Sequence, residues 1–154
     1  MNRWIPPGLR TCRTQLTAVC IWLFLMVPPV WAETSDELVI VSHPSVKLAS
    51  LSRESLWAMF GMHHQRWPDG QRVKVFVLEN KHPLHRRFAT DLLGTYPYQL
   101  ERVWQRLVYS GTGRAPHVCE SEEEMKRKVS ATPGAIGYLR RSAMEGGLHV
   151  IDIN

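Results

Sequence analysis

The sequence lacks the residue patterns of the common catalytic and metal sites. It has no HExxH motif and no phosphate loop of the Walker type, and no Ser-His-acid order or pair of catalytic carboxylates can be assembled. No cysteine or acidic residue stands at ligand spacing from the adjacent His63 and His64. We therefore expect a protein that is not an enzyme and that holds no metal and no cofactor.

Long apolar runs are also missing. The longest, LTAVCIWLFLMV, has about a dozen residues, whereas a membrane-spanning helix needs about 20. It follows a basic segment without acids and precedes PPVWA, in which Val30 and Ala32 occupy the −3 and −1 positions of a cleavage site. This order predicts a signal peptide over 1–32 and a periplasmic domain over 33–154 without stable membrane insertion. An uncleaved anchor is the alternative.

Without this leader the chain has a single cysteine and a small net charge. Cys12 and Cys20 lie within 1–32, so Cys119 stands alone and no internal disulfide is expected. We expect Cys119 to be a partly buried thiol, with an intermolecular link as the alternative. Three of the 19 basic residues and none of the 14 acidic ones belong to the leader, which leaves a formal net charge of +2. That charge does not indicate a nucleic-acid partner.

Four segments of the remaining chain predict strands. LVIVS at 38–42 is a short apolar run typical of a buried strand. RVKVFVL at 72–78 alternates, with its valines on one face and Lys74 on the other. TPGAIGYL at 132–139 reads as a turn followed by a strand, and LHVIDI at 148–153 as a last strand. WPDG, between the first two, predicts a tight turn.

Four other segments carry the start and stop signals of helices. Ser52 is placed to cap the first, which ends at Gly61. Pro83 opens the second and Pro97 the third, and a Ser-Glu capping box opens the fourth over 121–129. The apolar stripe expected on the third helix consists of Leu100, Trp104, Leu107 and Val108. Strands that alternate with helices predict one α/β domain with a mostly parallel sheet flanked by helices.

The stretch ENKHPLHRRF at 79–88 is the main candidate for a binding site. It joins the end of a strand to the start of a helix, where free backbone N–H groups and the helix dipole favour an anion. Ligands of open α/β sheets lie beyond the carboxyl ends of the strands. The candidate ligand-binding residues are Ser42, His43, Asn80, Lys81, His82, His85 and Arg86.

Two alternatives for the same stretch stay open. The cations are also consistent with a solvated helix face, and Pro83 removes one backbone donor. His82 and His85 are spaced to share a metal, but Glu79 is the only nearby carboxylate. A second glycine-containing loop, SGTGR at 110–114, allows close backbone approach to a phosphate, yet no helix opens directly behind it, which favours a plain loop.

The order of these motifs resembles the substrate-binding proteins of phosphate ABC transporters, and more closely their short, single-domain periplasmic relatives. The resemblance covers about residues 38–141 and is carried mainly by LWAMFG, WPDG and PGAIGY. It implies a single lobe of the type II periplasmic-binding-protein fold. It also implies a small oxyanion such as phosphate as the ligand, and an ABC transporter or another envelope protein as the partner.

The chain departs from the pattern of that family where the ligand is held. Alignment on Phe88 places Leu78 at the position of an arginine, Asn80 at that of an aspartate, and His82-Pro83-Leu84 at Ser-Gly-Thr. Most of the first lobe is expected to be absent, so that less of a ligand is buried. The sequence therefore predicts either a weak oxyanion-binding module or an interaction module that docks on an envelope partner and has lost phosphate binding.

Overall fold

The computed structural model describes residues 37–144 and 146–154. The predicted signal peptide lies outside these residues. Within them, no helix is both long and apolar enough to cross a membrane.

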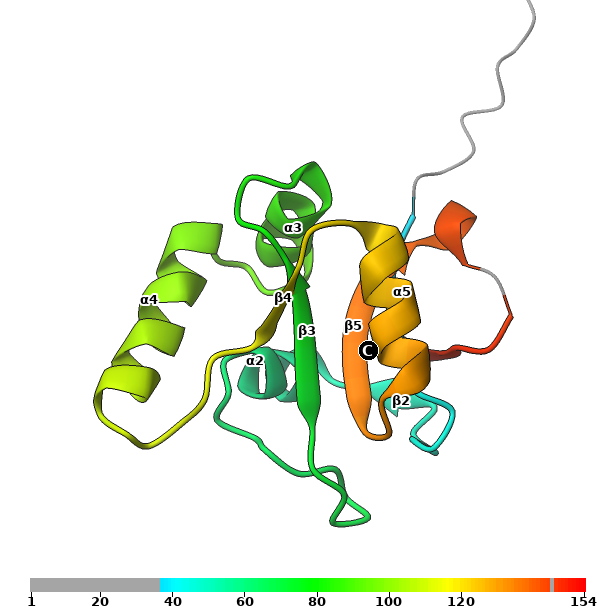
Figure 1. Cartoon of the computed structure of the whole chain (residues 1–154), viewed down its shortest axis with the longest axis horizontal. Helices are drawn as coiled ribbons and strands as arrows, with labels where there is room; N and C mark the ends of the chain where they lie inside the picture. Colours follow the sequence, from blue (N-terminus) through cyan, green and yellow to red (C-terminus); the bar gives the residue numbers. More distant parts are fainter. Residues whose placement is uncertain (1–36, 145) are drawn as a thin grey trace, which may run out of the picture. The chain divides into compact units, whose positions relative to one another are not determined.

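A six-stranded mixed sheet forms the centre of the described chain (Figure 1). The strands are β1 (Leu38–Ser42), β2 (Ser50–Leu51), β3 (Lys74–Leu78), β4 (His117–Cys119), β5 (Ala135–Arg140) and β6 (His149–Ile153). They lie in the order β2-β6-β1-β5-β3-β4. β1 is antiparallel to both β5 and β6, whereas β2–β6, β3–β5 and β3–β4 are parallel pairs. Five strands therefore run in one direction, which confirms a mostly parallel sheet.

Helices cover both faces of this sheet. They are α2 (Arg53–Phe60), α3 (Pro83–Arg87), α4 (Pro97–Tyr109) and α5 (Glu122–Ala131), with a π-helix η1 (Phe88–Leu92) that continues α3 and a 3₁₀ turn η2 (Arg141–Ala143). α5 packs on the face that carries Gly137, and the rings of Phe60 and Phe88 pack on Tyr138 from the other face. Figure 1 shows α4 and α5 on opposite sides of β3. The predicted α/β fold with flanking helices is confirmed.

The local signals explain where the helices start. Ser52 caps α2, because its side chain accepts a hydrogen bond from the backbone N–H of Ser55. Ser121 caps α5 through the N–H of Glu124. The Glu124 carboxylate, however, accepts from the N–H of Glu120 at 2.7 Å, one residue before the cap, so the predicted capping box is only half formed.

The structure extends one sequence prediction about an apolar face and corrects another. Phe76 and Leu78 are buried together with the valines of β3, because this strand lies between β5 and β4 and has helices on both faces. On α4, Leu100 and Trp104 are buried, but Val108 is 45% exposed. Trp104 donates its indole N–H to the carbonyl of Phe60 at 2.7 Å, which fixes the middle of α4 against α2.

Candidate functional site

The direction of β1 separates the predicted site residues into two groups. Ser42 pairs with Ile136, and Ile136 pairs with Val75 at the start of β3. Asn80 follows the end of β3, five residues further on, which is about 16 Å along the strand. Ser42 and His43 therefore lie at the opposite end of the sheet from Asn80, Lys81 and His82, and one small ligand does not reach both groups. The expectation that these residues meet is corrected.

At the carboxyl end of β3, two of the predicted ligand-binding side chains are already bonded to carboxylates. Lys81 Nζ lies 2.8 Å from a carboxylate oxygen of Glu79, a hydrogen bond that raises the pKa of Lys81. Asn80 donates to a carboxylate oxygen of Glu101 at 2.5 Å. The positive charge of Lys81 is thus balanced by Glu79, and Glu101 adds a negative charge beside it.

The start of α3 offers few free donors. Pro83 has no N–H, and the N–H of Leu84 donates to Nδ1 of His82 at 3.2 Å. His85 is fully buried, with Nδ1 2.6 Å from the Tyr138 hydroxyl, and burial lowers the pKa of His85 to about 4. His85 is therefore neutral at physiological pH and does not face solvent.

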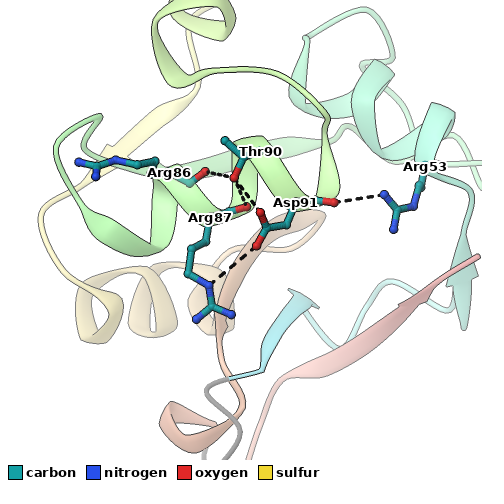
Figure 2. Close-up of polar contacts among 5 residues, drawn as sticks. All are labelled: Arg53, Arg86, Arg87, Thr90 and Asp91. Carbon is teal, nitrogen blue, oxygen red and sulfur yellow. Dashed lines mark hydrogen bonds and ion pairs between the residues drawn. The ribbon is translucent and has the colours of Figure 1, made fainter.

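The remaining predicted cation, Arg86, is exposed (Figure 2). Its side chain points away from Arg87, Thr90 and Asp91, whereas Arg87 Nε lies 3.9 Å from the Asp91 carboxylate. The carbonyl of Asp91 accepts from Arg53 at 3.1 Å, which ties η1 to α2. No group of three histidine, cysteine or acidic side chains that could hold a metal occurs in residues 37–144 and 146–154.

At the other end of the sheet, His43 belongs to a hydrogen-bonded loop. Its Nδ1 lies 2.9 Å from the hydroxyl of Ser45, which also accepts from the N–H of Gly134 and donates to Gln71. These bonds join the end of β1 to the turn before β5. Ser42 is fully buried, and its hydroxyl has no hydrogen-bond partner among the described residues.

A pocket of about 490 Å³ near the start of β3 collects basic side chains from distant parts of the chain. We call it the basic pocket; its charged lining residues are Arg66, Arg72, Lys74 and Arg114, with His117 beside them. No carboxylate occurs among its described lining residues. Arg66 and Arg72 stand directly opposite each other in an antiparallel bridge, an arrangement of like charges that disfavours folding.

Sequence reasoning missed this pocket, although one of its walls is the loop SGTGR. Gly111, Thr112 and Gly113 line the pocket. Because β3 and β4 are parallel, the start of β3 brings Arg72 and Lys74 beside Arg114. Only the glycine loop was a usable signal, since the pairing of β3 with β4 is not visible in the sequence.

A second hollow of about 700 Å³ lies between α4 and the strands β3 and β4, and we call it the α4–β4 groove. Its apolar lining includes Val77, Trp104, Val108, Tyr109 and Val118. Asn80, Lys81 and Glu101 line it at the carboxyl end of β3. The groove is therefore mainly apolar at the position where the sequence predicted an anion.

Several solved structures of phosphate-transport proteins have a fold similar to that of this chain. An ABC-type phosphate transport receptor from Vibrio cholerae superposes with a TM-score of 0.61 at 18% identity, and PstS from Borrelia burgdorferi with 0.59 at 20%. A putative phosphate ABC transporter substrate-binding protein from Clostridium perfringens, solved with bound phosphate, gives 0.61 at 12%. No protein-family model and no curated protein matches the sequence.

The chain thus has the fold of phosphate ABC transporter substrate-binding proteins, as the motif order predicted. The match covers 77% of this chain but only 45–47% of those three proteins. The chain spans less than half of their length.

Proposed function

We propose that the protein is an exported, non-enzymatic module with the fold of a solute-binding protein, and that it binds a small oxyanion such as phosphate in the basic pocket. The observation that supports this proposal is the lining of the pocket, with four cationic side chains and no carboxylate among the described residues. Arginine binds oxyanions by charge-assisted, bidentate hydrogen bonds. The basic pocket is open to solvent, which suits weak, reversible binding.

The stretch 79–88 is the competing position for the anion. Lys81 and Arg86 supply positive charge there, but Lys81 is paired with Glu79, and Glu101 accepts from the neighbouring Asn80. Bringing an oxyanion next to two carboxylates costs electrostatic energy, whereas the basic pocket carries no such cost. We therefore assign the anion to the basic pocket.

Calorimetric titration with phosphate and sulfate tests the assignment. Arg72→Gln and Lys74→Gln each remove one charge from the basic pocket, and each should raise Kd about tenfold or more. Lys81→Gln and Arg86→Gln are the matched controls and should leave Kd unchanged. The opposite ranking moves the anion to the stretch 79–88, and the absence of heat with any anion removes the binding proposal.

Export is part of the proposal and has its own test. Expression of the full chain followed by cell fractionation should recover the protein in the periplasm with Glu33 at its N-terminus. Recovery in the membrane fraction with an uncleaved leader would favour the anchor.

A second candidate function rests on the α4–β4 groove. Tyr109 is 87% exposed and Val118 55% exposed beside it, which is typical of a protein-docking surface. In this alternative the module docks on an ABC transporter or another envelope protein without binding phosphate. This function is supported if the wild type recovers a stoichiometric partner from an envelope extract and Tyr109→Ser does not. It is contradicted if the wild type and the variant recover the same partner.

A further inference from the structure

The exposed large apolar side chains of the described chain gather at one edge of the sheet. They are Tyr96, Tyr98, Val108, Tyr109 and Val118. All of them lie on α4, at its N-cap, or on the edge strand β4. The opposite edge strand, β2, is different, because its apolar residue Leu51 is only 6% exposed. The apolar exposure is therefore a property of the β4 edge and not of sheet edges in general.

The outer side of β4 is unpaired within the described chain. β4 pairs with β3 alone, and Val118 at its centre is 55% exposed. Proteins protect such edges from other strands with lysine, proline or bulges, or by keeping the edge strand very short. β4 has only three residues and follows Pro116, but His117, Val118 and Cys119 themselves include no lysine, proline or bulge and can pair with a further strand.

Charge is distributed unevenly along this edge. Arg72, Lys74 and Arg114 lie at the end where β3 and β4 begin. Glu79, Glu101 and Glu120 lie at the end where the two strands finish. Two lysines also lie at the acidic end, and each is paired with a carboxylate, Lys81 with Glu79 and Lys128 with Glu124. The edge therefore runs from basic to acidic in the direction of β4.

We propose that this edge joins a second copy of the chain, with the two β4 strands antiparallel about a two-fold axis at Val118. An axis perpendicular to the sheet makes the strands antiparallel, and it places the basic end of each copy against the acidic end of the other. An axis along the strands gives parallel pairing and sets basic against basic. The charge pattern selects the first arrangement.

The same axis also accounts for the apolar residues. A rotation perpendicular to the sheet keeps the faces of both sheets aligned, so the two α4 helices lie on one face of the joint. Val108 and Tyr109 of each copy then flank the paired β4 strands, and the two α4–β4 grooves meet across the axis. Two six-stranded sheets become one continuous sheet. This association goes beyond oxyanion binding, and an oxyanion in the basic pocket would compete with it for Arg72, Lys74 and Arg114.

Sedimentation equilibrium in phosphate-free, low-salt buffer tests the proposal on protein purified from cells that express the full chain. The wild type should be a dimer. Val118→Arg sets two arginines against each other across the axis and should raise the dimer dissociation constant at least about tenfold. Ser50→Arg, at the other exposed edge, is the matched control and should leave the mass unchanged. Thermal unfolding checks that both variants are folded.

Charge reversal tests the orientation without changing an apolar residue. Arg114→Glu and Glu120→Arg should each weaken the dimer, because each brings like charges together across the axis. The double variant should restore it. A monomer mass for the wild type at about 1 mM overturns the proposal, since a specific interface is half-occupied well below that concentration. A dimer that Val118→Arg leaves intact, or a double variant weaker than both single ones, overturns it as well.

Discussion

Nδ1 of His85 lies 2.6 Å from the hydroxyl oxygen of Tyr138, and this oxygen also accepts the backbone N–H of Leu78 at 2.9 Å. Burial raises the pKa of Tyr138 and lowers that of His85, so the proton stays on the phenol and the imidazole is neutral. The Tyr138 hydroxyl therefore accepts from Leu78 and shares a hydrogen bond with Nδ1 of His85. It links α3 to β3 and β5 inside the core.

We predict that Tyr138→Phe lowers the free energy of unfolding by about 2–3 kcal/mol, because it leaves the buried N–H of Leu78 and Nδ1 of His85 without a partner. Urea denaturation measures the change. Tyr98→Phe is the matched control, since the Tyr98 side chain is 54% exposed and should change stability by less than about 0.5 kcal/mol. Equal effects of the two variants would contradict the role of the hydroxyl.

His85 should make stability depend on pH. Burial, with a smaller contribution from the charge of His82, lowers the pKa of His85 from 6.5 to about 4 in the folded protein. The unfolded chain therefore binds the proton first as the pH falls. The contribution of His85 is fully present above about pH 6.5 and is lost progressively down to about pH 4, a total of about 3 kcal/mol.

Unfolding free energies of the wild type and of His85→Met between pH 4 and 7.5 check this prediction. The wild type should lose more stability than the variant as the pH falls. The carboxylates titrate in both proteins, so they cancel in the difference. His64→Gln, at an exposed loop position, should follow the wild type. A pH-independent difference between wild type and His85→Met would show that the imidazole does not titrate in this way.

Two glycines that both have a positive φ angle should lose different amounts of stability on substitution by alanine. Gly70 has φ of +85° and open space around a Cβ, whereas Gly134 has φ of +78° and a Cβ there would collide with the carbonyl oxygen of Arg72. Gly70→Ala should cost about 1–2 kcal/mol through backbone strain alone. Gly134→Ala should cost at least about 3 kcal/mol, because the collision is added to the strain. Thermal or urea unfolding ranks the pair, and a Gly70→Ala cost equal to that of Gly134→Ala would refute the collision.

Cys119 should be protected from thiol reagents in the folded protein. It is fully buried, and burial raises the pKa of its thiol. Since the thiolate is the reactive form, we expect negligible labelling at pH 8 and rapid labelling in urea, with the site identified by mass spectrometry. Labelling of native Cys119 at the unfolded rate would show that the β4 edge opens readily.

The sequence was sufficient for elements that carry their own periodicity or caps. β1, α2 and α5 begin within a residue or two of their predicted positions, because Ser52, Ser121 and the β-branched run act locally. The strands β2 and β4 were missed, since two or three residues show no periodicity. The predicted turn at WPDG is present, with the N–H of Gly70 donating to the carbonyl of Trp67.

The candidate site depended on relations that no local pattern carries. The direction of β1 is fixed by its pairing with β5 and β6, near the far end of the chain. The carboxylate beside Asn80 comes from Glu101 on α4. The bridge between Arg66 and Arg72 and the parallel pairing of β3 with β4 create the basic pocket. Each of these facts requires the three-dimensional structure.

The position of β1 also determines when the fold can close. β1 is the first strand of the described chain, yet both of its neighbours, β5 and β6, come from its last 20 residues. Its backbone N–H and C=O groups stay without strand partners until Ala135 to Ile153 have been synthesised. Such high sequence separation slows folding, because the entropy of a long loop is lost before the contacts form. We therefore expect the part of the sheet around β1 to form late and slowly in folding.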